Sequence, residues 1–230
     1  NQFSPIGNSF RGSLIPESAF ETSGLLHTLA GGNRVELVEC RRSDAELFDF
    51  YSSLIAGGSR FESGLAAAVR EARARLTYDG LAEHNLVISH QKRIRLNREL
   101  NQQLAPRGAV RLEITGKASR GNAARTMLLW PGIVLIGCLA VSKHGIQNGV
   151  LYTVESVTRE TVVLVGGVSL SHAHAKTCLR LSYAQTYASC QGSEFDGHLR
   201  LHDTSHKFFT LKHLFVGLSR AKVASEVGLA

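Results

Sequence analysis

Apolar residues recur along the chain at two spacings, which predict two kinds of element. A recurrence every three to four positions indicates a helix with one buried face. Helices are predicted in this way over residues 21–29, 45–54, 62–76, 90–104 and 212–218, with a polar helix start at 185–190. Short apolar runs bounded by polar turns indicate buried strands. Such runs occur at residues 35–38, 85–89 and 179–184.

The segment 106–176 has a different pattern. Its β-branched runs at 133–141, 150–157 and 161–165 are separated by Gly-rich or Asn-Gly turns, which favour antiparallel hairpins. No helix is expected there. Strand-then-helix patterns on either side of this segment are typical of a parallel sheet. The sequence therefore predicts an α/β domain with a small antiparallel β-barrel inserted into it.

The charge balance adds an expected partner to this picture. The 230 residues include 26 Lys and Arg against 19 Asp and Glu, and the net charge of +7 favours an anionic partner such as nucleic acid or nucleotide. The apolar share of 43% is too high for a disordered chain. The longest apolar run, 133–141, is much shorter than the ~18 residues that a membrane span needs, so we expect no membrane protein.

The cysteines and the first residue bear on where the protein works. The four cysteines form no Cys-x-x-Cys pair, which indicates neither a zinc ribbon nor a disulfide scaffold. We therefore expect reduced thiols in an intracellular protein. The chain opens at Asn1, its single methionine is Met127, and it has no signal-peptide pattern. We expect it to begin inside a longer protein.

Several basic residues stand at the ends of predicted elements, although no complete phosphate-binding loop of the type GxxxxGKS/T occurs. Arg42 follows a strand, Lys92 and Arg95 share a helix face with His90, and Arg220 follows an apolar helix. A cationic helix face can follow a phosphate backbone, and an arginine at a buried helix end can neutralise phosphate charge. An ordinary solvated helix face and a structural salt bridge are the alternatives.

The histidines raise the question of a metal site. His198, His202 and His206 repeat every four residues, and His172 and His174 would share one face of a strand. The residues around the first three are poor helix formers, and no nearby cysteine completes a ligand set. We predict loop histidines and no metal site. The chain also lacks the GxSxG elbow of a nucleophilic serine.

Six segments follow, in order, the motif pattern of one enzyme family. They are QFSPI at 2–6, ELVECRRSD at 36–44, LVISH at 86–90 with Asn97, IVLI at 133–136 with GIQNGV at 145–150, SYAQT at 182–186 with QGSEF at 191–195, and LFVGLSRA at 214–221. Together they resemble motifs III to VI of superfamily 1 DNA helicases, in particular those of the Pif and RecD-like group. The last two segments carry most of the resemblance.

The resemblance implies a RecA-like domain of the P-loop NTPase type that contains the inserted β-barrel. Residues 1–35 would be the tail end of a first RecA-like domain. Residues 36–105 and 177–230 would form the second, and residues 106–176 the barrel. The rest of the first domain, with the Walker A and B motifs, would precede this chain, so the chain alone is expected to be inactive.

The resemblance also implies a function. The protein would be an ATP-dependent DNA helicase of replication or repair that couples ATP hydrolysis to 5′-to-3′ translocation on single-stranded DNA and to duplex unwinding. It would use ATP and Mg²⁺, with the Mg²⁺ ligands in the missing N-terminal half. Gln2, Arg42 and Arg220 would act on the γ-phosphate. Nucleotide contacts are implied for Gln191, Gly192 and Glu194, and nucleic-acid contacts for Lys92, Arg95, Asn97 and Thr186.

The sequence departs from the family's motif V at Ala188 and Ser189, where that motif has His-Lys. This departure implies an altered strand contact or an altered coupling of hydrolysis to movement. Two other functions stay open: a non-catalytic nucleic-acid-binding module, such as a degenerate helicase, and a viral RNA helicase. A P-loop upstream would favour an active motor, and ATPase stimulation by DNA or by RNA would separate the two motors.

Overall fold

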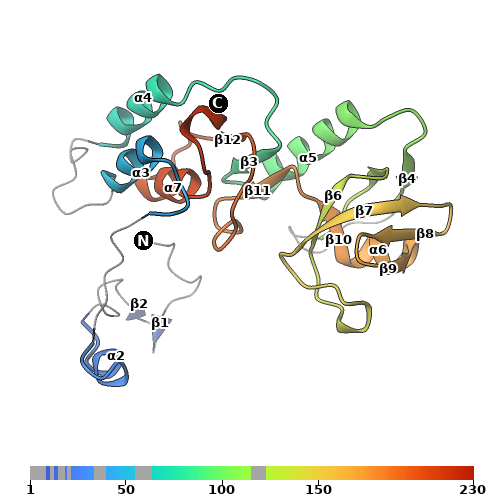
Figure 1. The fold of residues 1–230 in the computed structure, drawn as a ribbon, viewed down its shortest axis with the longest axis horizontal. Coiled ribbons are helices and arrows are strands. Elements are labelled where there is room, and N and C mark those ends of the chain that lie inside the picture. The colour runs from blue at the N-terminus through green and yellow to red at the C-terminus, as the bar shows by residue number, and fades with distance from the viewer. Residues whose placement is uncertain are drawn as a thin grey trace.

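The computed structural model describes residues 9–10, 13–14, 19, 22–33, 40–54, 64–114 and 123–230. Gln2 and the strand predicted at 35–38 lie outside these residues. Two hydrophobic cores organise the described chain, one around a parallel sheet and the other around an antiparallel sheet. Figure 1 shows these two units joined by helix α5 (His90–Leu104).

The first core surrounds a four-stranded sheet in which all neighbouring strands are parallel. In spatial order the strands are β11 (Ala184–Thr186), β3 (His84–Val87), β12 (Leu199–Leu201) and β13 (Val227–Leu229). The helices that share its core are α3 (Ala45–Ser52), α4 (Leu65–Arg75) and α7 (Leu211–Leu218). Leu47, Leu86 and Leu214 meet there with no exposed surface. Strands covered in this way are short apolar runs, as the sequence predicts.

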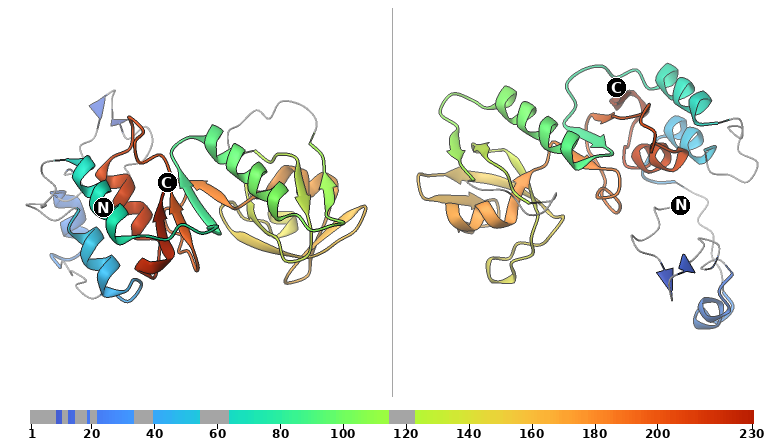
Figure 2. Two further views of the ribbon diagram at one scale, coloured as in Figure 1. Left: turned by 90° about the horizontal axis from the view of Figure 1, so that it is seen from above. Right: turned by 180° about the vertical axis from the view of Figure 1, so that it is seen from behind.

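The second core lies within an antiparallel sheet of five strands, which curls over its own apolar face (Figure 2). In spatial order the strands are β10 (Leu179–Leu181), β6 (Val134–Gly137), β7 (Leu151–Val157), β8 (Thr161–Leu164) and β9 (Val168–Ser171). A separate ladder of β4 (Val110–Leu112) and β5 (Met127–Leu129) contributes to the same core. The predicted fold class, a parallel α/β sheet with an inserted antiparallel β unit, is confirmed.

Polar caps explain where two of the predicted helices begin. The side chain of Asp44 accepts a hydrogen bond from the Leu47 N–H at 2.8 Å and starts α3. Ser89 accepts one from the Lys92 N–H at 3.1 Å and starts α5. Such caps satisfy N–H groups that have no partner within the helix. The observed bounds of α5 are those predicted from the sequence.

Two buried asparagines fasten α5 to both units. Asn97 pairs with the backbone of Ala184 at the start of β11, donating to its carbonyl at 2.9 Å and accepting from its N–H at 3.1 Å. Asn101, one turn later, pairs in the same way with Leu128 of β5, at 2.9 and 2.8 Å. Each side-chain amide thus satisfies both the backbone N–H and the carbonyl of a strand residue, as a neighbouring strand would.

The prediction that residues 106–176 contain no helix is wrong, because α6 (His172–Cys178) lies there. Ser171 caps it by accepting a hydrogen bond from the His174 N–H, and Ala175 and Cys178 are buried against the strands. His172 and His174 therefore lie on a helix and not on one face of a strand. A helix of seven residues is too short for its periodicity to stand out in the sequence.

The helix start predicted at 185–190 is also wrong, since its first residues belong to β11. The strand predicted at 179–184 divides at Ser182 and Tyr183, so that β10 joins the antiparallel sheet and β11 the parallel one. Gln185 and Thr186 are polar but buried, because pairing with β3 outweighs their local preference.

The remaining described elements are short. They are β1 (Ser9–Phe10), β2 (Ser13–Leu14), α2 (Gly24–Leu29) and the 3₁₀ turns η1 (Ser142–His144) and η2 (Ala224–Glu226). Figure 1 shows α2, β1 and β2 apart from the two larger units. In the described parts of the chain, no helix has the length and apolar character needed to cross a membrane.

Candidate functional site

The segment before α3 lies beside the segment after α7. Ser43 donates a hydrogen bond from its hydroxyl to the Ala221 carbonyl at 2.9 Å, and the Asp44 N–H donates to the Lys222 carbonyl at 2.8 Å. The second carboxylate oxygen of Asp44 accepts from the Ala224 N–H at 2.8 Å. These contacts bring together two parts of the chain that lie far apart in sequence.

Arg42 and Arg220 converge on Ser219 as a result. Arg42 donates from a terminal guanidinium nitrogen to the Ser219 carbonyl at 3.2 Å. Arg220 donates to the Ser219 hydroxyl from Nε at 3.3 Å and from Nη2 at 2.9 Å. The hydroxyl in turn donates to the carbonyl of Val216 in α7. One residue at the end of a buried helix therefore orients two guanidinium groups.

The loop before β12 supplies the other contacts of both arginines. Nε of Arg42 donates to Oε1 of Glu194 at 2.5 Å, and Nη1 of Arg220 donates to the Ser193 carbonyl at 3.2 Å. Burial lowers the pKa of Arg220, and Arg42 adds to that shift by repulsion. Arg220 keeps its charge at neutral pH despite this shift, since an arginine is protonated throughout the physiological range.

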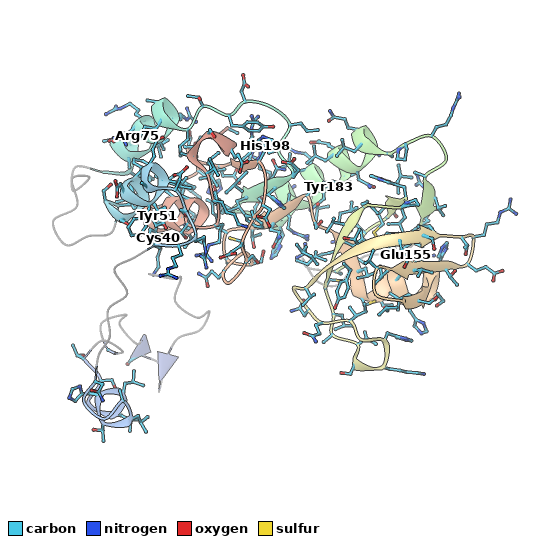
Figure 3. The ribbon with its side chains drawn as sticks, viewed as in Figure 1. Cys40, Tyr51, Arg75, Glu155, Tyr183 and His198 are labelled. Atoms are coloured by element: carbon cyan, nitrogen blue, oxygen red, sulfur yellow. The ribbon has the colours of Figure 1, made fainter. Side chains whose placement is uncertain are left out.

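A surface pocket of about 550 Å³ opens beside Arg42. Its wall also includes Cys40, Tyr51, Glu194 and Lys222. Figure 3 shows Cys40 next to Tyr51, whose hydroxyl lies 3.4 Å from the Cys40 sulfur. Burial and the contact with Cys40 raise the pKa of Tyr51 to about 12. The tyrosine therefore stays neutral, and the net charge of the wall comes from its basic side chains.

Gln191, Gly192 and Glu194, for which the resemblance implies nucleotide contacts, lie on one loop. Gly192 has a φ of +86°, a conformation that favours glycine. Nε2 of Gln191 is buried and has no hydrogen-bond partner among the described residues. Of the three, Glu194 alone lines the pocket beside Arg42.

Lys92 and Arg95 lie together at the start of α5, as predicted. They line a shallow hollow of about 310 Å³ with Ser89 and Gln91. Lys92 forms an ion pair with Asp203, with 2.7 Å between the two charged groups. Arg95 is well exposed, and its ion pair with Glu99 is longer, at 3.8 Å. The positive charge of Arg95 is thus more available to a phosphate than that of Lys92.

Asn97 and Thr186 are not at this surface, although the resemblance groups them with Lys92 and Arg95. Asn97 is 4% exposed, and its amide is occupied by Ala184. Thr186 is buried and bonds the hydroxyl of Ser189 at 3.0 Å. In this structure both side chains hold the backbone in place.

His198 and His202, two of the three histidines that repeat every four residues, have different partners. His198 lies 3.0 Å from a carboxylate oxygen of Glu83 and stacks on Tyr78, while Nε2 of His202 is 2.9 Å from the side-chain oxygen of Asn85. Among the residues described, no group of three or more His, Cys, Asp or Glu side chains could hold a metal ion.

Ser219 and Asp203 contact predicted site residues, although no role is predicted for them from the sequence. Ser219 could have been found as the one polar residue between an apolar helix and Arg220. Asp203 has a φ of +65°, accepts from the Ile88 N–H at 2.9 Å and binds Lys92. No sequence pattern marks that pairing, which depends on β3 and β12 being neighbours.

No protein-family model matches the chain, and comparison with curated proteins gives no match. Solved structures do match it. A structure of DNA unwinding at forked duplex DNA by two coordinating Pif1 helicases has a TM-score of 0.58 and 15% identity, covering 83% of this chain and 48% of that one. A Bacteroides Pif1 helicase in complex with ADP-AlF3 and single-stranded DNA has a TM-score of 0.56 and 17% identity, covering 85% and 51%.

A Pif1 helicase from Candida albicans has a TM-score of 0.55 and 14% identity, covering 81% of this chain and 53% of that one. This chain thus spans about half the length of the Pif1 helicases that it matches. At these identities the likeness is one of fold. The chain has a helicase-like fold, and the predicted resemblance to Pif-type helicases holds at the level of structure.

Proposed function

We propose that this chain is the C-terminal half of an ATP-dependent helicase in which Arg42 and Arg220 act on the γ-phosphate of ATP. One observation carries the proposal: the two arginines converge on Ser219, which Arg42 precedes by 177 positions. Phosphoryl transfer gathers negative charge on the transferred group, and guanidinium groups fixed in position stabilise that charge.

The ion pair with Glu194 suits Arg42 to such a role. Both side chains are partly exposed, so water screens the attraction between them. A phosphate that entered the pocket would compete with the carboxylate for the same guanidinium. Glu194 would then be released to contact the nucleotide elsewhere, while the Ser219 carbonyl kept Arg42 in place.

The residues at hand suit part of an ATP and Mg²⁺ site. Arg42 and Arg220 provide positive charge for phosphates, whereas the described residues offer no carboxylate cluster for Mg²⁺. Following the motif resemblance, we assign the Mg²⁺ ligands and the phosphate-binding loop to a preceding RecA-like domain. Gln2, in the tail of that domain, would orient the attacking water or sense the γ-phosphate.

The domain assignment is part of the same proposal. Residues 1–35 would end the first RecA-like domain, 36–105 and 177–230 would form the second, and 106–176 the inserted unit. Closure of the two RecA-like domains on ATP would then assemble the site from both sides. The first domain would hold the nucleotide and the second would supply the arginines.

For nucleic acid we propose a strand path over the start of α5. Lys92 and Arg95 would contact the phosphates of single-stranded DNA, and Asn97 and Thr186 would act by positioning the backbone beneath them. The Pif1 helicases of similar fold are described in complex with single-stranded DNA and at forked duplex DNA. Movement from 5′ to 3′ belongs to this proposal through the motif resemblance.

The test is Arg220→Ala in the full-length protein. Loss of an arginine that stabilises the transferred phosphate lowers turnover by about 10³-fold or more. We expect that loss in DNA-stimulated ATPase turnover, with ATP binding retained. Arg159→Ala, an exposed arginine between β7 and β8, is the matched control. Turnover at the control's level would overturn the assignment of Arg220.

A non-catalytic nucleic-acid-binding module is the second candidate. Ser189 favours it, because this residue stands where motif V has a lysine. Its hydroxyl forms hydrogen bonds with Thr186 and carries no charge that could attract a nucleic-acid strand. Such a module would bind single-stranded DNA or RNA with no ATPase activity in the full-length protein. A viral RNA helicase would instead hydrolyse ATP with RNA as the better stimulator.

A further inference from the structure

A second cationic pocket lies between α5 and the antiparallel unit, apart from the surface around Arg42. Its volume is about 230 Å³. Four arginines contribute to its wall: Arg93 and Arg98 from α5, Arg125 from the approach to β5, and Arg180 from β10. None of the described residues that line it is acidic. The proposed motor uses none of these four arginines.

Arg180 is the most unusual of the four. It is 4% exposed, and among the described residues its Nε and Nη1 have no hydrogen-bond partner. A buried guanidinium that lacks partners loses its hydration without compensation, which costs free energy. Burial lowers the pKa of Arg180, but an arginine is still charged at neutral pH.

Among the described residues that line the pocket, none carries a negative charge that would neutralise Arg180. Burial, Arg180 and Arg125 together lower the pKa of Arg93 to about 10, so this neighbour is cationic as well at pH 7. Burial raises the pKa of the nearby Cys138 thiol, which is therefore protonated.

We propose that this pocket binds a phosphate-class oxyanion, which accepts hydrogen bonds from Arg180 and is held by the charges of Arg93, Arg98 and Arg125. The planar guanidinium presents paired N–H groups that match two oxygens of a phosphate. The anion would supply the acceptors that Arg180 lacks and reduce the repulsion among the arginines. Its source is either free phosphate or the phosphodiester backbone of a nucleic acid, since both present the same oxygens.

The test compares unfolding of the full chain in inorganic phosphate and in chloride at equal ionic strength. The variant Arg180→Met removes the charge and keeps a long side chain. Arg159→Met makes the same change at an exposed position and is the control. Without phosphate, we expect Arg180→Met to be at least as stable as the original chain, because it removes a buried charge that lacks partners.

Phosphate should then separate the proteins. At phosphate ten times above its dissociation constant, the unfolding equilibrium constant of the original chain and of Arg159→Met should fall about elevenfold. Arg180→Met should not respond. A single-stranded oligonucleotide forms the second arm, and protection that depends on Arg180 with this probe alone would identify a phosphodiester as the source.

The proposal is overturned if neither probe protects the original chain, or if Arg180→Met responds as the original chain does. If Arg180→Met does not fold, Arg125→Gln decides, because Arg125 is only half-buried. An unchanged phosphate response in that variant would overturn the proposal, and a weaker one would support it. The inference does not depend on ATPase activity, since inorganic phosphate is the first probe.

Discussion

Arg42 donates a hydrogen bond to Glu194 across 2.5 Å, and the two side chains are 39% and 47% exposed. An ion pair that accessible contributes at most about 1 kcal/mol to stability, because water and salt screen it. The ion pair matters because Glu194 occupies the guanidinium of Arg42. A phosphate that binds Arg42 would have to displace this carboxylate.

Glu194→Gln tests this competition. The substitution keeps the side chain's size and removes its charge, so Arg42 becomes more available. We expect ATP to bind several-fold more tightly to the full-length protein, with unfolding changed by less than about 1 kcal/mol. Titration with a fluorescent ATP analogue measures the affinity, and Glu155→Gln, on the antiparallel unit (Figure 3), is the control. Unchanged or weaker binding would contradict the competition.

Ser219→Ala tests how Arg220 is held. The change removes the hydroxyl that accepts from two nitrogens of Arg220, but leaves the carbonyl that accepts from Arg42. We expect a loss of about 1 kcal/mol in stability, typical of a lost hydrogen bond. We also expect a fall in ATPase turnover with little change in ATP affinity.

Ser53→Ala is a close match for that experiment. The Ser53 hydroxyl also donates to a carbonyl three residues earlier at a helix end, in this case that of Phe50. If both variants lowered turnover equally, a general effect on stability would explain the loss and Ser219 would have no positioning role.

The salt dependence of DNA binding tests the start of α5. DNA affinity falls with salt concentration, and each phosphate contact that is lost makes the plot of log affinity against log salt concentration less steep by about 1. We expect that change for Arg95→Gln and a smaller one for Lys92→Gln, because Asp203 already neutralises Lys92. Fluorescence anisotropy with labelled single-stranded DNA gives the slopes. Equal slopes for Arg95→Gln and for Arg111→Gln, an exposed control on β4, would argue against this strand path.

His202 predicts how stability depends on pH. Burial, followed by repulsion from Lys92, lowers its pKa from 6.5 to about 4, with Asp203 opposing and Arg200 adding to the shift. The unfolded chain therefore takes up this proton more readily than the folded one. The free energy of unfolding is not reduced by this group above pH 6.5. As the pH falls towards 4, protonation of His202 in the unfolded chain lowers the free energy of unfolding by up to about 3 kcal/mol.

Urea unfolding between pH 7.5 and 4.5 measures this effect. We expect His202→Gln to lose less stability than the original chain over that range, because it removes the titrating group. His206→Gln, in an exposed turn, should keep the original pH dependence. Identical pH profiles for both variants would show that His202 does not dominate this transition.

The sequence predicts this fold best where an element carries its own signals. Helix α5 has an apolar face and a capping serine, and its bounds follow from them. Helix α6 and strand β11 are short and depend on tertiary pairing, so their residues give no such signal. The burial of polar residues is harder still to predict. In the sequence Asn97 is a polar residue on a basic helix, and only the folded structure shows that its amide bonds the backbone of Ala184.

The candidate site divides along the same line. Arg42 and Arg220 can be selected from motif order alone, whereas their meeting at Ser219 requires the folded chain. Arg180 gives no warning in sequence, since an arginine between two leucines is typical of an alternating strand with one face in water. Its burial depends on α5 covering that face.

The two asparagines of α5 have a mechanical consequence. Asn97 and Asn101 bind the backbone of Ala184 and Leu128 from successive turns of one helix, so separating β11 or the β4–β5 ladder from α5 breaks a pair of hydrogen bonds. The two asparagines are four positions apart, so both attachments lie within about 6 Å of each other along the helix axis. A rotation of the parallel sheet would therefore be transmitted to the antiparallel unit through this one turn of α5.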